Sequence, residues 1–304
     1  YWAAGTSIGD DFPFKEKDLV TGEKLMRKIW NASKLVDQLV PEQVEEPADL
    51  DPIDEWMLAE LDRTVEFMTD QMNDYGFAKA RNRLREFFWH TFCDNYLEIA
   101  KQKLDDERNP STEYVLQEAH QTFLKLFAPF LVHITEEIWH ERYGDTSIHL
   151  EDWPEPRGVD ADRDAGRAAM DVIHALRKYK SEHRMAPTDE LEQVEVYGDI
   201  TGFADAVSEV MHVQELQVRD DSPDVTEDVT GIDLNYERVG PAYGEKVGEI
   251  EAALDEDDYT LDSDQLRVAG ETLTADEFTV ETERTYQGDG EMVETGTATV
   301  VVHA

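Results

Sequence analysis

The chain has 304 residues, with 70 Asp and Glu against 28 Lys and Arg, and a formal net charge of −42. This length is enough for two domains with hydrophobic cores, and no run of about 18 apolar residues is present to span a membrane. Disorder is excluded because 40% of the residues are hydrophobic and 10% are aromatic. The acidity therefore predicts a folded protein that works at high salt, where screening removes the self-repulsion.

The cysteine content and the first residues indicate a cytoplasmic protein. A single cysteine, Cys93, excludes an internal disulfide framework and a multi-cysteine zinc site. The opening sequence YWAAG lacks the basic start and the apolar stretch of a signal peptide. It also lacks a starting Met, so we expect the chain to begin inside a longer protein.

Apolar residues in the first half recur at spacings of three and four, which predicts amphipathic helices packed as a bundle. The expected helices lie at about 22–40, 54–73, 77–104 and 112–128, with a further start near Thr135. Pro129 is expected to end the fourth helix, because proline cannot continue an α-helix.

The pattern changes after an extended stretch around 153–158, which favours a domain boundary there. The elements expected after it are helices at about 160–186, 203–210 and 242–254, and strands at 191–197, 213–218, 231–236, 278–284 and 295–302. The last two strands are predicted to form a hairpin closed near Gly288. The predicted fold is thus a mainly α helical bundle over 1–158, followed by a small α+β domain over 159–304.

The run 87–101 reads FFWHTFCDNYLEIAK, with aromatic residues on one side of a helix. It closely resembles the signature helix of valyl-tRNA synthetases, F-x-W-x-x-F-C-D-x-Y-L-E-x-x-K. Other segments resemble the same family in the same order: YWAA at 1–4, KIWNASK at 28–34, APFLVHITEEIW at 128–139 and SIHLEDWP at 147–154. NYERVGPAYG at 235–244 is similar to a C-terminal segment of archaeal-type class I synthetases for branched aliphatic amino acids. The resemblance implies the end of the stem-contact fold at residues 1–4. It also implies a class I synthetase anticodon-binding domain and C-terminal region of an archaeal, halophilic type.

The resemblance implies tRNA binding without catalysis by this chain alone. Neither H-x-G-H nor K-M-S-K-S occurs, so the ATP, valine and editing sites of the family are expected outside it. We therefore expect no catalytic residue and no cofactor here, with ATP and Mg²⁺ needed only by the full enzyme. The expected partners are tRNA(Val) and the catalytic domain of the same enzyme.

Binding of tRNA needs positive charge against phosphates and polar or planar side chains against unpaired bases. Four residues fall at i, i+4, i+7 and i+11 on one face of the first helix: Lys24, Lys28, Asn31 and Leu35. The resemblance implies that this helix faces the anticodon. It matches Lys28 and Asn31 to motif positions, and it gives Leu35 the place where the family often has Phe.

Lys34 lies on the same helix, and Lys17 is expected in the turn before it. The alternative is that these lysines are solvated or paired with neighbouring acids.

Two more basic groups are candidates for contact with the tRNA backbone. Arg81 and Arg85 share a helix face and can hold phosphates, or can form salt bridges with acidic helices. Arg177 and Lys178 lie on the helix after the boundary, where the alternative is a basic helix docked on an acidic bundle.

Two other patterns have a structural explanation. His133, Glu137 and His140 recur along one helix face, but the spacing is not that of H-E-x-x-H, so no metal site is expected. Cys93 lies among aromatic residues and is expected to be a buried structural thiol. For the whole chain, the alternatives are the same region of an isoleucyl- or leucyl-tRNA synthetase, or a helical interaction module without tRNA binding.

Overall fold

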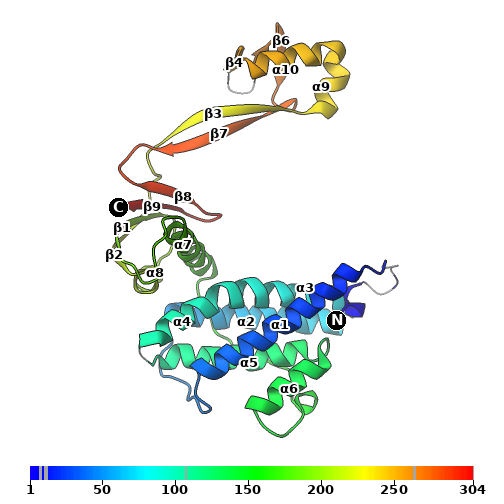
Figure 1. The fold of residues 1–304 in the computed structure, drawn as a ribbon, viewed down its shortest axis with the longest axis vertical. Helices are drawn as coiled ribbons and strands as arrows, with labels where there is room; N and C mark the ends of the chain where they lie inside the picture. Colours follow the sequence, from blue (N-terminus) through cyan, green and yellow to red (C-terminus); the bar gives the residue numbers. More distant parts are fainter. Residues whose placement is uncertain (7–8, 10–12, 107, 263–264, 304) are drawn as a thin grey trace. The chain divides into compact units, whose positions relative to one another are not determined.

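A computed structural model describes residues 1–6, 9, 13–106, 108–262 and 265–303 of the chain. The chain divides into two compact units, of which the first comprises Tyr1–Asp221 and Val293–Ala304, and the second comprises Ser222–Met292 (Figure 1). Among the residues that the structure places, no helix is both long and apolar enough to cross a lipid bilayer.

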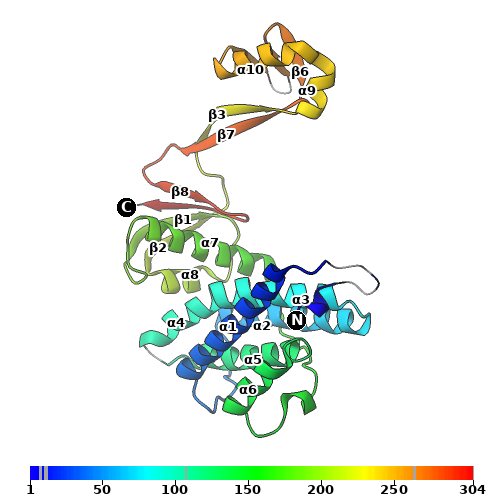
Figure 2. The same cartoon turned by 45° about the vertical axis from the view of Figure 1, so that its right-hand side comes forward.

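The first unit begins with the predicted helical bundle. Its helices are η1 (Ala3–Gly5), α1 (Glu16–Leu39), α2 (Pro52–Asn73), α3 (Phe77–Glu86), η2 (Phe87–Tyr96), α4 (Leu97–Asp106), α5 (Pro110–Phe127), α6 (Val132–Arg142) and η3 (Ile148–Leu150). α3, η2 and α4 follow one another without a gap and form one helical run, of which the middle part, η2, is a π-helix. α1 contacts α5 and α6, and Figures 1 and 2 show it lying obliquely across the bundle.

The bundle core is built by the aromatic residues of η2 and α5. The ring of Phe88 lies 5.1 Å from that of Phe123 and 5.4 Å from that of Phe127, between centroids. Phe92 lies 4.9 Å from Phe123. Cys93 is buried beside them, and burial raises the pKa of its thiol to about 12, so the predicted structural thiol is confirmed.

Asp54, in the first turn of α2, is a fully buried carboxylate that joins four elements. Its Oδ1 accepts a hydrogen bond from the Tyr96 hydroxyl of η2 at 2.7 Å. Its Oδ2 accepts hydrogen bonds from Ser111 and Thr112 at the start of α5, at 2.7 and 2.8 Å. The Lys103 ammonium of α4 lies 3.0 Å from the same oxygen. A carboxylate can be buried here because it is both paired and hydrogen-bonded.

The crossover after the bundle is held against α2 by a second buried carboxylate. The backbone N–H groups of Arg157, Gly158 and Val159 donate to Asp62 Oδ2 at 2.9, 2.8 and 3.2 Å. The chain there has no helix or strand, and three consecutive backbone N–H groups are satisfied by a single side chain.

The helix that follows, α7 (Arg163–Glu182), also packs on α2. Gly166 lies against the indole of Trp56, at a distance that leaves no room for a Cβ atom. Arg163 Nε lies 3.1 Å from Glu60 Oε1. These contacts keep α7 with the bundle, so the division between units falls after Asp221 and not at the predicted 158/159.

The first unit ends in a four-stranded sheet. Its elements are β1 (Leu191–Tyr197), α8 (Ala204–Met211), β2 (Val213–Arg219), β8 (Glu291–Glu294) and β9 (Thr299–His303). The strand order is β2-β1-β9-β8, with β1 parallel to β2 and antiparallel to β9.

The second unit is a small α+β structure. Its elements are β3 (Val225–Leu234), α9 (Tyr236–Tyr243), η4 (Gly244–Lys246), α10 (Val247–Asp255), β4 (Tyr259–Asp262), β5 (Gln265–Val268), β6 (Glu271–Thr274) and β7 (Phe278–Tyr286). β3 and β7 form an antiparallel ribbon, and β4, β5 and β6 form a separate sheet. Its core contains Leu234, Val239, Ile250, Leu266, Val268, Leu273 and Phe278.

The predicted hairpin between 278–284 and 295–302 is wrong. β7 pairs with β3, and β9 pairs with β1. Alternation along a strand identifies its buried face, but it carries no information about which other strand lies beside it. The fold class itself, a helical bundle followed by an α+β region, is confirmed.

Asp54→Ala should lower the free energy of unfolding by about 3 kcal/mol, because a partner of the buried Lys103 ammonium is removed. The loss stays at the low end for a broken buried pair, since Asp51 Oδ2 remains 2.6 Å from Lys103. Denaturant unfolding in molar KCl measures it. Asp49→Ala, an exposed change in the linker before α2, should cost less than about 0.5 kcal/mol. Equal losses in the two variants would contradict the role of Asp54.

Candidate nucleic-acid interface

α1 runs without a break over 24 residues, so the i, i+4, i+7, i+11 spacing places its four predicted residues on one face. The opposite side is buried in the bundle through Gly22, Leu25, Ile29, Ala32, Ser33 and Val36. Within the described part of the chain, Lys24 and Asn31 are exposed and have no side-chain partner, while Lys28 and Leu35 are partly buried. We call Lys24, Lys28, Asn31, Lys34 and Leu35 the α1 face.

Lys28 is held in place by the signature run in η2. Its ammonium lies 2.8 Å from Asp94 Oδ1 and 5.4 Å from the centroid of the Trp89 ring. The other oxygen of Asp94 lies 3.2 Å from Nδ1 of His90. The Lys28 and Asp94 side chains remain 32% and 41% exposed, so the pair adds little stability and mainly orients the lysine.

A second lysine on the α1 face also lies beside an indole ring. The ammonium of Lys34 is 5.1 Å from the centroid of the Trp30 ring, and Lys34 is exposed. Cations next to aromatic planes combine charge for phosphate with a surface on which a base can stack. The α1 face thus offers both kinds of contact that single-stranded RNA requires.

A buried histidine anchors the inner side of α1. His120 of α5 lies 2.8 Å from Ser33 Oγ and 2.6 Å from the Tyr143 hydroxyl. Burial, with a smaller contribution from the charge of Arg142, lowers the pKa of His120 to about 3. The imidazole is therefore neutral at physiological pH and bridges α1 to the bundle.

The prediction that Lys17 lies in a turn before the helix is wrong, because α1 begins at Glu16. Lys17 is exposed in the first turn, and its carbonyl accepts a hydrogen bond from Thr21 Oγ1 at 3.1 Å. The acidic Glu16 and Asp18 in that turn favour an earlier start, since negative charge stabilises a helix N-terminus.

Arg81 is engaged by the first residues of the chain. Its guanidinium carbon lies 4.6 Å from the centroid of the Tyr1 ring, and Nη1 donates to the Tyr1 carbonyl at 3.2 Å. Nη2 donates to Asn82 at 2.8 Å. Arg85 lines the same cavity of about 280 Å³. The two arginines are together, as predicted, but Arg81 already binds the N-terminal segment.

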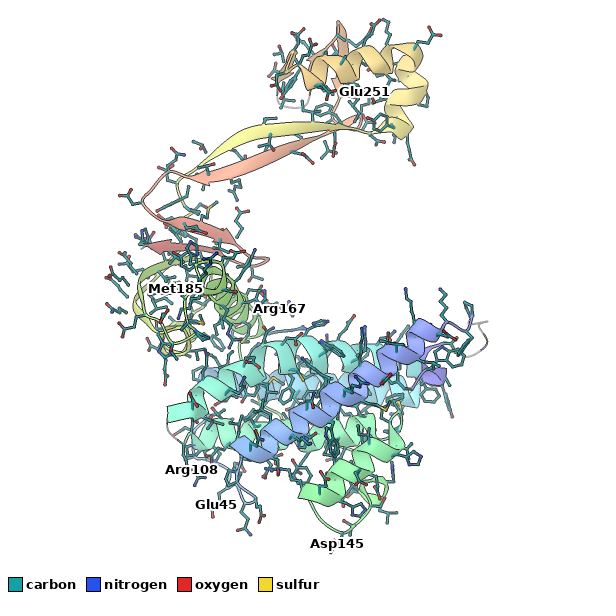
Figure 3. The ribbon with its side chains drawn as sticks, in the orientation of Figure 1. Glu45, Arg108, Asp145, Arg167, Met185 and Glu251 are labelled. Carbon is teal, nitrogen blue, oxygen red and sulfur yellow. The ribbon has the colours of Figure 1, made fainter. Side chains whose placement is uncertain are left out.

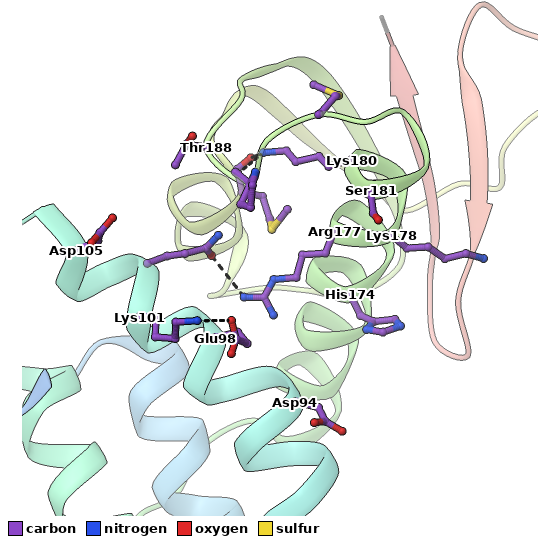
Figure 4. Close-up of a pocket in the computed structure, with 14 residues that line it drawn as sticks. Asp94, Glu98, Lys101, Asp105, His174, Arg177, Lys178, Lys180, Ser181 and Thr188 are labelled. Carbon is purple, nitrogen blue, oxygen red and sulfur yellow. Dashed lines mark hydrogen bonds and ion pairs between the residues drawn. The ribbon is translucent and has the colours of Figure 1, made fainter. Parts of the chain in front are cut away.

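The basic residues of α7 have different environments. Lys178 is exposed, 3.8 Å from Glu182. Lys180 is only 2% exposed, and its ammonium donates to the carbonyls of Pro187, Asp189 and Met211, so it is structural. Arg177 is partly buried, and burial lowers the pKa of its guanidinium. Figure 4 shows Arg177 reaching from α7 towards α4, where Nη2 lies 3.4 Å from Gln102 Oε1.

Reasoning from the sequence missed Trp89 and Asp94 as neighbours of Lys28. Both belong to the signature run, so the motif marks them. Their contact with α1 crosses more than 60 residues of sequence, however, and no local pattern predicts it.

Known proteins similar in sequence to this chain are tRNA ligases. Residues 54–196 match the sequence model of the anticodon-binding domain of tRNA ligases. A valine–tRNA ligase of Haloarcula marismortui is 57% identical over 304 residues, which cover 99% of this chain and 34% of the relative. Valine–tRNA ligases of Methanothermobacter thermautotrophicus and Natronomonas pharaonis are 34% and 32% identical, over 80% and 99% of this chain and 29% and 37% of their own lengths.

The chain therefore spans about a third of the length of the curated relatives it matches. Among solved structures, a LeuRS–tRNA–LeuAMS complex of Agrobacterium radiobacter K84 matches 53% of this chain and 20% of that chain, with 16% identity and a TM-score of 0.40. A similarity this low carries no argument about the site.

The buried His120 predicts a specific loss of stability in acid. Its pKa is about 3 when folded and 6.5 in the unfolded reference, so between these values only the unfolded chain binds the proton. Stability from this residue is full above pH 6.5 and is lost as the pH falls towards 3. The loss between pH 6.5 and 5 should be about 2 kcal/mol.

Denaturant unfolding of the native chain and of His120→Gln across this pH range, in molar KCl, checks the prediction. The difference between the two curves isolates His120, because the carboxylates titrate in both proteins. Parallel curves would mean that His120 is not the neutral bridge described here.

Proposed function

We propose that this chain is the anticodon-binding and C-terminal region of a valyl-tRNA synthetase, and that it binds the anticodon arm of tRNA(Val) through the α1 face. The observation that supports this most is the row of outward lysines on a chain with net charge −42. Lys24 has no acidic partner among the described residues, and Lys28 and Lys34 stand beside indole rings. Such a row fits a polyanionic ligand that carries unpaired bases.

High salt decides which contacts can supply the affinity. Phosphate contacts weaken steeply as salt rises, because fewer counterions are released on binding. Stacking and hydrogen bonds to bases are less affected by screening. We therefore assign the larger part of recognition to Lys28, Asn31 and the indole of Trp30, with Leu35 as an apolar contact for a base.

The remaining basic residues act on the RNA backbone in this proposal. Lys17 extends the α1 face by two turns towards the N-terminus of the helix. Arg81 and Arg85 contribute positive potential beside the N-terminal segment, and Arg177 and Lys178 do so on α7. These contacts do not depend on the identity of the bases.

In the full enzyme, this region holds the tRNA so that its acceptor end reaches a catalytic domain outside this chain. Its contribution is binding energy and orientation. Activation of valine with ATP and Mg²⁺ belongs to that catalytic domain, and the whole enzyme works in the cytoplasm.

Lys28→Ala should reduce discrimination between tRNA(Val) and the same tRNA with a changed anticodon by about 1–3 kcal/mol, because a base contact is lost. The measurement is the Kd for both RNAs in molar KCl. Lys79→Ala removes the same charge from an exposed position on α3 and should leave the discrimination unchanged.

Equal losses of affinity for both RNAs in the Lys28 variant would contradict base recognition by the α1 face. No binding of any tRNA by the native chain, at any salt, would favour a helical module without tRNA binding. Preference for an isoleucine or leucine tRNA would assign the region to a related synthetase.

A further inference from the structure

A cleft of about 860 Å³ lies between α4 and α7 within the first unit. Figure 4 shows its two walls, with Glu98, Lys101 and Asp105 on α4, and His174, Arg177 and Ser181 on α7. The loop at Pro187 and Thr188 and the end of α8 at Met211 also line it. A volume in this range fits a small ligand or a single nucleotide.

Arg177 presents unused hydrogen-bond donors to this cleft. The one acceptor that the described residues give it is the Gln102 amide, at 3.4 Å from Nη2. The carboxylate of Glu98 acts electrostatically on Arg177, but it forms its ion pair with Lys101, at 2.9 Å. A partly buried guanidinium normally meets a carboxylate or phosphate in a two-pronged contact, and here that place is open.

The other walls of the cleft fit the apolar part of a nucleotide. Met185 and Pro187 follow α7, and Met211 is fully buried at the end of α8. Methionine side chains adapt to flat ligands because they are flexible and polarizable. The hydroxyls of Ser181 and Thr188 add hydrogen-bonding groups at the exposed rim.

Asp94 connects the cleft with the α1 face. Asp94 lines the cleft and at the same time holds Lys28, at 2.8 Å. An RNA group that contacts Lys28 is therefore close to a residue that lines the cleft. The acidic groups there, Asp94, Glu98 and Asp105, disfavour a run of phosphates and leave room for one anion at Arg177.

We propose that this cleft binds one unpaired nucleotide of the bound RNA, with its phosphate on Arg177 and its base against Met185 and Pro187. The inference rests on the proposed function, because it places the nucleotide next to an RNA already held on the α1 face. It adds a pocket-type contact to a surface otherwise made of exposed side chains.

Two variants test the phosphate contact. Arg177→Ala removes the guanidinium, and Gln102→Glu puts a carboxylate where the amide now lies, so that Arg177 is neutralised without a change of shape. Each should weaken binding of the tRNA(Val) anticodon stem-loop about tenfold in molar KCl, the loss typical of a charged hydrogen bond. Gln102→Glu also covers the case in which Arg177→Ala does not fold.

Two matched controls change the same charges elsewhere. Arg167→Ala removes an exposed arginine from α7, labelled in Figure 3, which does not line the cleft. Gln43→Glu adds a carboxylate at an exposed position in the linker after α1. Both should leave the affinity within about twofold, because distant charges are screened at this salt.

A fluorescent base locates the nucleotide. The stem-loop is made with 2-aminopurine at each loop position in turn, and one position should change its fluorescence on binding the native chain. That change should be absent with Gln102→Glu and present with Gln43→Glu, at RNA concentrations that saturate both proteins.

Three outcomes are distinguished. Tenfold losses confined to Arg177→Ala and Gln102→Glu, together with the localised fluorescence change, support the cleft. Binding by the native chain that all four variants keep within twofold overturns the cleft and leaves the proposed function standing. No binding by the native chain overturns the proposed function, and the cleft with it.

Discussion

The buried carboxylate of Asp54 is the interaction on which the rest of the bundle depends. It lies where α2 begins, and it receives hydrogen bonds from η2 and α5 and an ion pair from α4. An unpaired charge at this depth would cost several kcal/mol, so any arrangement that separates these elements from Asp54 is disfavoured. The α1 face and the cleft are built on elements that this group holds, because Trp89 and Asp94 lie in the same π-helix as Tyr96.

The π-helix η2 contributes residues both to the bundle core and to the surface beside α1. Phe88, Phe92 and Tyr96 point into the bundle and are buried. Trp89 and Asp94 lie on its outer side, one against the ammonium of Lys28 and the other paired with it. The same ten residues therefore fix the packing of α5 and set the position of the lysine on α1. In the proposed function, a substitution in this run changes recognition without a direct contact to RNA.

Lys and Arg are few in this acidic chain, and their positions are uneven. Residues 187–304 carry five Lys and Arg against 32 Asp and Glu, whereas residues 1–186 carry the other 23 Lys and Arg. Several of these are used internally: Lys103 on Asp54, Lys180 on three carbonyls and Arg81 on Tyr1. Among the described residues, Lys24 and Lys34 of the α1 face and Arg177 are cations that form no ion pair with a carboxylate. In the proposed function, screening at high salt makes the placement of these cations, and not the total charge, the source of specificity.

The sequence by itself determined the helices of the bundle, the buried thiol of Cys93 and the face shared by Lys24, Lys28, Asn31 and Leu35, because all of these depend on local periodicity. The resemblance to valyl-tRNA synthetases rests on motifs that can be read without coordinates. Only the tertiary structure decided the partners of β7 and β9, the use of Arg81 by the N-terminal segment and the open donors of Arg177. Strand pairing and side-chain partners depend on groups far apart in sequence. Periodicity identifies the buried face of an element, but it does not predict which other element packs against that face.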